Sequence, residues 1–92
     1  MNFEAIHNYY EPLVIEHVMN TIAKDDNHDE DFLEDVVCLS LNRLPARYVR
    51  HDVDMAFFLT TREREKMQHD ITEAVLNAVH TVTERNRENA QT

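Results

Sequence analysis

Three arginines and one tyrosine within eight residues are the side chains of this sequence whose types and spacing best suit ligand binding. Arg43, Arg47, Tyr48 and Arg50 lie in a stretch without an acidic residue, and Pro45 stands between the first two arginines. A guanidinium pairs with phosphate through two parallel hydrogen bonds and stacks on flat rings, so arginine suits a nucleotide better than lysine would. The pattern predicts a site for a small anionic ligand formed by these four residues.

The charge pattern along the chain favours a specific anion site over general attraction to polyanions. Residues 1–42 contain ten acidic residues and one basic residue, whereas acids and bases number eight each from residue 43 onward. Three arginines cannot offset the net charge of −9 when a whole duplex approaches. We therefore expect no direct binding of double-stranded DNA.

Other reactive residue types lack the spacing that catalysis needs. The six histidines are scattered along the chain: His7, His17, His28, His51, His69 and His80. No two of them stand four apart beside a carboxylate, as a metallohydrolase helix requires. Ser40 lies in an apolar stretch without the strained turn of a hydrolase nucleophile. Glycine is absent, which removes phosphate-binding loops and dinucleotide-binding turns, and we expect a protein without enzymatic activity or cofactor.

Metal binding is also disfavoured by the spacing of the candidate ligands. The acidic run from Asp25 to Asp31 lacks the alternating ligands and the sharp-turn glycine of a calcium loop. Cys38 is the single cysteine, and one cysteine builds neither a thiolate zinc site nor an internal disulfide. The sequence predicts no metal site.

Apolar periodicity predicts a mainly α-helical single domain over residues 1–92, with three principal helices at about 10–23, 30–44 and 61–85. The third helix would be about 36 Å long, which is long for so small a domain, so we expect it to extend beyond one subunit. The polar tail after Arg85 is expected to be frayed.

Capping residues mark the ends of these helices. Asp29 or Asp31 is a candidate N-cap for the second helix, and Pro45 ends it because the residue before proline avoids the α region. Thr60 followed by Glu63 reads as a capping box that starts the third helix. In the absence of glycine, Asn27 and Asn42 are the candidates for left-handed backbone at helix ends.

The segment 47–59 between the second and third helices is expected to be short and extended. Residues 47–50 and 55–59 are β-prone, and the residues between them would form a turn. The two pieces could pair as a small hairpin or lie extended on the helices.

A second subunit and a cytoplasmic location are further expectations. A chain of 92 residues buries only about 60–65% of the surface that its unfolded form exposes. The first two predicted helices are apolar over more than one face, which predicts a homodimer. No apolar run approaches the ~18–20 residues of a membrane span, and the N-terminus has no basic region of a secretory signal. The lone cysteine also fits a cytoplasmic protein without a membrane segment.

The central segment resembles a known family signature. Residues 35–49 read DVVCLSLNRLPARYV, and residues 8–14 read NYYEPLV. Both are similar to the late competence development (ComFB) family, and residues 61–82 resemble its long final helix. Some members carry a cysteine cluster that suggests zinc, but residues 29–34 replace that cluster here.

The resemblance implies a regulatory homodimer that binds cyclic di-GMP or cyclic di-AMP in competence, motility or related bacterial signalling, with a downstream regulatory protein as a further partner. The arginine segment, residues 43–50 with Arg43, Arg47, Tyr48 and Arg50, would then be the ligand site. The alternative is a structural protein-protein interaction adaptor with no nucleotide ligand. In that case the arginines form salt bridges, Asn42 caps the second helix, and Tyr48 packs in the dimer core.

Overall fold

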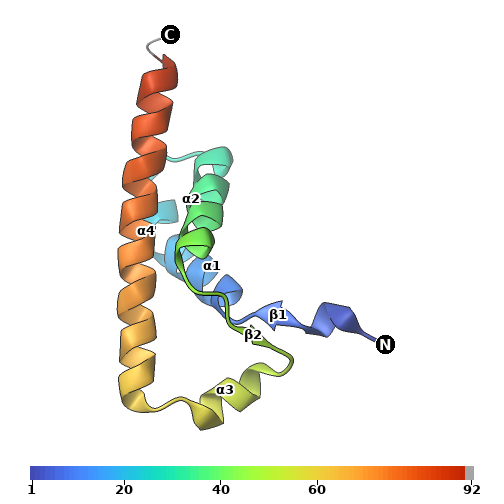
Figure 1. Ribbon diagram of the computed structural model, residues 1–92. Helices are drawn as coiled ribbons and strands as arrows, with labels where there is room; N and C mark the ends of the chain where they lie inside the picture. Colours follow the sequence, from blue (N-terminus) through green and yellow to red (C-terminus); the bar gives the residue numbers. More distant parts are fainter. Residues whose placement is uncertain (91–92) are drawn as a thin grey trace.

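Four α-helices make up most of residues 1–90, the part of the chain that the computed structural model describes (Figure 1). They are α1 (Tyr10–Asn20), α2 (Glu30–Arg43), α3 (Asp52–Phe58) and α4 (Thr61–Ala90). Two short 3-10 turns, η1 (Phe3–Ala5) and η2 (Ile22–Lys24), flank α1, and two short strands, β1 (His7–Asn8) and β2 (Tyr48–Val49), pair with each other. The expectation of a mainly helical fold is confirmed.

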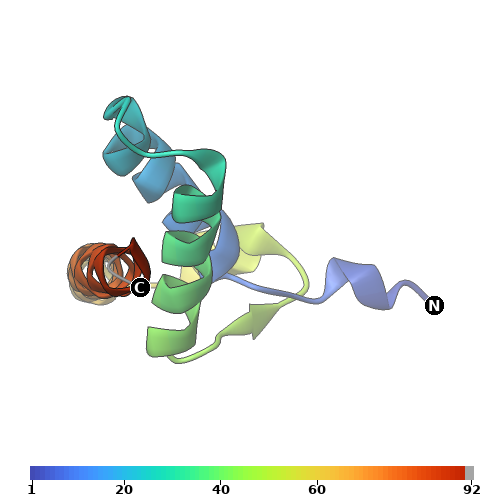
Figure 2. The same cartoon turned by 90° about the horizontal axis from the view of Figure 1, so that it is seen from above.

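The core forms where α1 and α2 pack against one side of the long helix α4 (Figure 2). The side chains of α4 that face α1 and α2 recur at steps of three and four residues, as an amphipathic helix requires. These buried residues are Met67, Ile71, Ala74, Val75, Ala78 and Val82. The small side chains of Ala74 and Ala78 let a second helix approach α4 closely. Burying each larger apolar side chain contributes about 1.5–3 kcal/mol.

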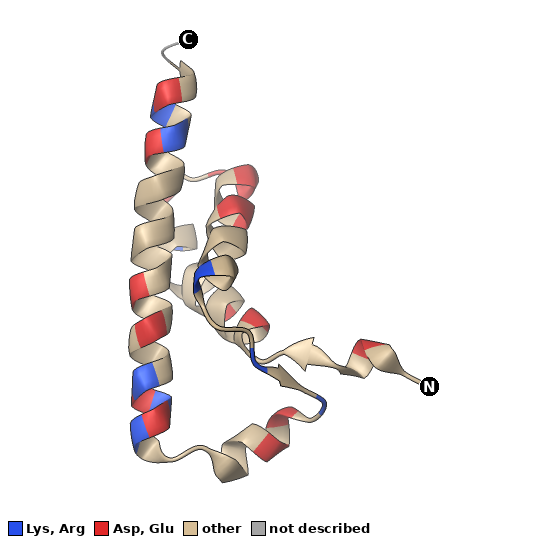
Figure 3. Ribbon diagram, in the orientation of Figure 1, with Lys and Arg blue, Asp and Glu red and all other residues tan. Residues whose placement is uncertain are grey.

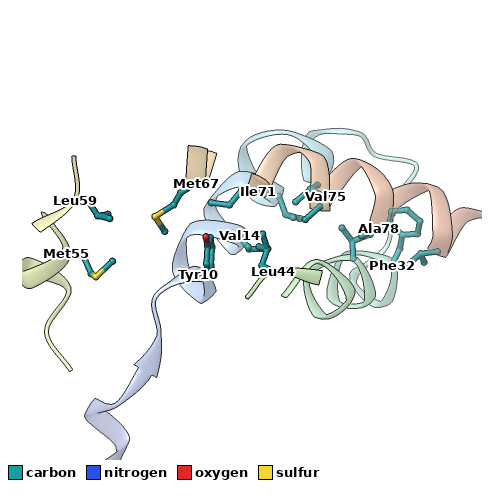
Figure 4. Packing of buried hydrophobic residues seen from close by; sticks show 14 residues of the cluster. Tyr10, Val14, Phe32, Leu44, Met55, Leu59, Met67, Ile71, Val75 and Ala78 are labelled. Carbon is teal, nitrogen blue, oxygen red and sulfur yellow. The ribbon is translucent and has the colours of Figure 1, made fainter. Parts of the chain in front are cut away.

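The same core continues from α2 to α3 along α4 (Figure 4). Phe32 on α2 lies at one end of the buried cluster. Met55 on α3 and Leu59, which follows α3, lie at the other end and point toward Tyr10 and Met67. A side-chain hydrogen bond from Arg64 to the carbonyl of Ala56 also links α4 to α3.

The predicted caps of the two longer helices are confirmed. Asp29 is the N-cap of α2, and its Oδ1 accepts a hydrogen bond from the Phe32 backbone N–H at 2.8 Å. Before α4, Thr60 Oγ1 accepts from the Glu63 N–H at 3.1 Å and donates to the Glu63 carboxylate at 3.1 Å. The bonds from the N–H groups of Phe32 and Glu63 satisfy backbone donors that the first turn of a helix leaves without intrahelical partners.

The extended or hairpin arrangement expected for residues 47–59 is wrong over most of its length. Only Tyr48–Val49 forms a strand, and it pairs with β1 near the N-terminus instead of with residues 55–59. Residues Asp52–Phe58 form α3, in which Met55 is buried. Burial of Met55 and of Leu59 against α1 and α4 outweighs the β propensity of the two phenylalanines between them.

Two helix boundaries and two expected caps differ from expectation. The helix α1 ends at Asn20, and the turn η2 follows it. Helix α4 continues through the polar residues after Arg85 to Ala90, because arginine and glutamate are good helix formers. Within residues 1–90 no residue has positive φ, so Asn27 and Asn42 are not left-handed caps. Asn42 lies inside α2, which ends at Arg43 and is followed by an extended Leu44 before Pro45.

The molecule is elongated for its size. Its radius of gyration is 15.0 Å, whereas about 12 Å is typical of a compact chain of this length. Figure 1 shows the reason, since both ends of α4 extend past α1 and α2, and the N-terminal segment projects away from the helices. Within residues 1–90, no helix is both long enough and apolar enough to cross a membrane.

Candidate functional site

The side chain of Asn8 fixes the backbone of the arginine segment. Asn8 is 7% exposed, and its Oδ1 accepts the N–H of Tyr10 at 3.2 Å and the N–H of Arg47 at 3.0 Å. The carbonyl of Arg47 in turn accepts the Tyr9 N–H at 2.6 Å. The first turn of α1 and the start of β2 are therefore held by one network, and Tyr48 pairs with Asn8 in the two-stranded ladder.

Tyr48 and Arg50 lie on the outward face of this segment. Side chains alternate between the two faces of an extended chain, and Val49 takes the inward side, where it packs against the core. Tyr48 is 69% exposed, so its ring lies outside the core of a single subunit. Arg50 is also exposed, and its Nε contacts the His51 ring nitrogen Nε2 at 3.1 Å. A flat ring and a guanidinium two residues apart are thus both exposed on the surface.

Arg47 is also exposed, and its positive charge acts on the hydroxyl of Tyr10. Burial raises the pKa of the Tyr10 phenol, and the nearby Asp70 carboxylate adds to the rise. The positive charges of Lys66 and Arg47 lower this pKa, so the charge of Arg47 lies within electrostatic reach of the Tyr10 hydroxyl. All three residues of this segment, Arg47, Tyr48 and Arg50, are therefore exposed to solvent.

Arg43 is held against α4. Its Nη2 donates a hydrogen bond to Thr81 Oγ1 at 2.9 Å, and the Thr81 hydroxyl donates to the Asn77 carbonyl. The neighbouring cavity, of about 330 Å³, is also lined by the acidic residues Asp70 and Glu73. Carboxylates there disfavour a phosphate ligand. A single subunit therefore brings Arg47, Tyr48 and Arg50 onto one short segment and engages Arg43 elsewhere.

The charge distribution follows the pattern expected from the sequence (Figure 3). Acidic residues gather at the start of α2 and on α3, while the end of α2 and the flanks of β2 are basic. Among residues 1–90, no ion pair involves Arg43, Arg47 or Arg50. The salt bridges of the alternative interpretation are therefore not formed within one subunit.

Two features of this region have no spacing signal in the sequence. Asn8 stands 39 residues before Arg47, and only its place in the resembled first-helix motif marks it. His7 contacts Asp52 across 45 residues, at 2.6 Å between Nε2 and Oδ1. Neither pair follows a local periodicity, because the β1–β2 ladder brings them together.

An apolar groove lies between α1 and α2. It has a volume of about 460 Å³, and its lining residues are Ile15, Val18, Met19, Leu33, Glu34, Val37, Cys38 and Leu41. Ile15 is 48% exposed and Met19 is 57% exposed, although both are large apolar side chains. The wide apolar faces expected on the first two helices are present, and one of them is open in a single subunit.

Metal ligands do not gather in the described part of the chain. No group of three or more histidine, cysteine, aspartate or glutamate side chains within residues 1–90 is arranged to hold a metal ion. Cys38 is exposed and carries a free thiol. The ring of His28 stacks on Phe32 at 4.2 Å between centroids, so this histidine beside the acidic loop takes part in packing. The absence of structural zinc stays a prediction.

Comparison with known protein families gives a match over most of the chain. The family model described as late competence development protein ComFB matches residues 7–86. No curated protein and no solved structure matches the chain. The matched range includes β1, the arginine segment and nearly all of α4, so Asn8 and the segment that it anchors are part of what the family model covers. The chain therefore belongs to the late competence development (ComFB) family.

Proposed function

We propose that this protein is a non-enzymatic receptor for a cyclic dinucleotide and acts as a homodimer in competence-related regulation. Membership of the family supports the regulatory role. The ligand class is supported by the chemistry of the arginine segment, in which phosphate-pairing and ring-stacking side chains are adjacent. The cytoplasm is the proposed location, because cyclic dinucleotides are intracellular messengers.

The observation that carries this proposal is the anchored backbone beneath an exposed Arg47–Tyr48–Arg50 segment. Asn8 holds the Arg47 N–H, and the adjacent ladder holds Tyr48. A segment whose backbone is already ordered loses less conformational entropy when it binds a ligand. The exposed Tyr48 ring offers a stacking surface for a base, and the guanidiniums offer bidentate contacts for phosphates.

The homodimer is supported by the open groove between α1 and α2 and by the elongated shape. A single subunit leaves Ile15 and Met19 half exposed, and its radius of gyration exceeds that of a compact chain of this length. Covering the groove with a second copy removes this apolar surface from water, as obligate interfaces do. A two-fold dimer also presents the arginine segment twice, which suits a two-fold symmetric ligand.

Calorimetric titration tests the receptor. Purified protein is titrated with cyclic di-GMP and cyclic di-AMP, with linear dinucleotides of the same bases as controls. Saturable binding of one cyclic ligand, together with a higher melting temperature in its presence, supports the proposal. No binding of either ligand at low salt, with no protection on heating, refutes it.

The second candidate is the interaction adaptor without a nucleotide ligand. The observation in its favour is a second exposed apolar surface on α3, where Phe57 is 81% exposed and Phe58 is 79% exposed. Adjacent exposed aromatic residues of this kind mark contact surfaces for other proteins. The adaptor predicts that variants at Phe57 or Phe58 lose partner binding while cyclic dinucleotides have no effect.

A further inference from the structure

The imidazole of His7 lies between two hydrogen-bond acceptors. Its Nδ1 is 2.9 Å from the Ala5 carbonyl oxygen, and its Nε2 is 2.6 Å from Asp52 Oδ1. A neutral imidazole has one N–H and can donate to only one of these oxygens, whereas the protonated ring donates to both. Both contacts are therefore satisfied together only when His7 carries a positive charge.

These two contacts join three elements around the arginine segment. Ala5 belongs to η1, His7 belongs to β1, and Asp52 is the first residue of α3. His7 also pairs with Val49 of β2 in the ladder. The contact between His7 and Asp52 thus ties the segment after β2 to β1. The bond between Asn8 and Arg47 ties the residue before β2 to the same strand.

We propose that His7 and Asp52 form a proton-dependent clasp that positions β2, so that ligand binding by the Arg47–Tyr48–Arg50 segment is linked to protonation of His7. With the clasp closed, both ends of β2 are tied to the N-terminal strand. When His7 loses its second proton, its ring can donate to only one of the two oxygens and the charge-assisted pairing with Asp52 is lost, so the end of β2 beside Arg50 is held less firmly. The linkage to binding rests on the proposed function, whereas the clasp itself does not.

The groups that surround His7 give the sign of the effect. The Ala5 carbonyl and the Asp52 carboxylate raise the pKa of His7, and Glu11 on α1 adds to the rise, while partial burial opposes it. On the β2 side, the paired residue Val49 is uncharged, and Arg50 is engaged with His51. Because the folded pKa is raised, the stabilisation is complete below the unfolded pKa of about 6.5 and is lost as pH rises through the folded value.

The first experiment uses the free protein. Proton NMR follows the ring resonances of His7 with pH in the wild type, in Asp52→Asn and in the control His80→Gln, which alters an exposed residue on α4. We expect a pKa for His7 above the usual value in the wild type and the control, and a lower one in Asp52→Asn. In His7→Gln, the amides of β1 and β2 should exchange faster than in the wild type at about pH 6. An ordinary or lowered pKa for His7 in the wild type overturns the clasp.

The second experiment measures the dissociation constant of the cyclic dinucleotide at about pH 6 and about pH 8.5. Wild type and His80→Gln should bind several-fold more tightly at the lower pH, and His7→Gln should lose most of this difference. The same pH dependence in His7→Gln as in the wild type overturns the linkage. If no cyclic dinucleotide binds at either pH, the proposed function fails and the linkage with it, while the NMR titration still decides whether the clasp exists.

Discussion

The side-chain oxygen of Asn8 accepts the backbone N–H of Arg47, 39 residues further along the chain, at 3.0 Å. The same oxygen accepts the N–H of Tyr10 at the start of α1. One buried amide therefore orders both the beginning of a helix and the segment that carries the candidate ligand residues. The stability of the fold and the order of the candidate ligand segment therefore depend on the same residue.

Replacing Asn8 with alanine should destabilise the fold. The substitution removes the acceptor of two backbone donors, and an unsatisfied buried donor costs about 1–3 kcal/mol. We expect a loss of about 2 kcal/mol, which lowers the melting temperature of a domain of this size by about 8–16 °C. Asn20→Ala, at the exposed end of α1, is the matched control and should change little. Equal melting curves for the two variants would contradict the assigned role of Asn8.

Arg47→Ala and Arg50→Ala should each weaken cyclic-dinucleotide binding while the fold stays intact. A charge-assisted hydrogen bond contributes about 1.5–3 kcal/mol, so the affinity should fall about tenfold or more. Arg47→Lys should recover only part of the loss, because an ammonium lacks the planar fork and the stacking surface. Calorimetric titration measures the affinity. Arg87→Ala, at the far end of α4, is the control for the loss of one positive charge.

The four arginine-segment residues need not contribute equally. Arg43 is bonded to Thr81 on α4, so a ligand contact by Arg43 requires that bond to be exchanged. If Arg47→Ala binds the cyclic dinucleotide as tightly as the wild type and has an unchanged melting curve, the site assignment is wrong. The proposal that the protein is a cyclic-dinucleotide receptor would not be affected by this result.

Ile15→Glu should convert a homodimer to a monomer. Ile15 lines the open groove between α1 and α2 and is half exposed in one subunit, so the subunit itself tolerates a carboxylate there. In the dimer the same carboxylate would be buried without a partner. Light scattering should show a mass near 10.9 kDa for the variant and about twice that for the wild type. Gln68→Glu adds the same charge at an exposed position of α4 outside this groove and should remain dimeric.

Val75→Glu should damage folding itself. Val75 is 1% exposed in the middle of α4, so the substitution places an unpaired carboxylate in the core. Circular dichroism should show loss of the cooperative thermal transition. A stable, cooperatively folded Val75→Glu protein would contradict the position of the core along α4.

A chelator should leave the melting temperature unchanged, because the sequence predicts no structural zinc. A bound structural zinc would contribute a large part of the folding free energy of so small a domain, and its removal would unfold the protein. Stoichiometric zinc in carefully purified, untagged protein would contradict this prediction.

The helices could be predicted from the sequence because their signals are local. The step of three and four residues along Met67, Ile71 and Val75 indicated the buried face of α4, and Thr60 with Glu63 marked its start. Helix α3 could not be predicted, since its phenylalanines favour a strand and only burial of Met55 against distant residues selects the helix.

The residue types of the candidate site could be predicted from the sequence. Their arrangement in space could be predicted only in part. The absence of acidic residues from positions 43–50 identified Arg47, Tyr48 and Arg50. These three residues are exposed on one segment of the structure. The separate engagement of Arg43 with Thr81 and the contact between His7 and Asp52 depend on tertiary packing over 38 and 45 residues. No local pattern in the sequence encodes such distances.

The ladder between β1 and β2 also bears on the order in which the chain folds. Closing a loop of about 40 residues costs entropy that the local turns of α2 and α4 do not require. Helices form within about a microsecond, and contacts between residues distant in sequence form more slowly. We expect β2 to take its final shape after the helices have docked. A partly folded chain would then have its helices and still lack an ordered arginine segment to offer to an anion.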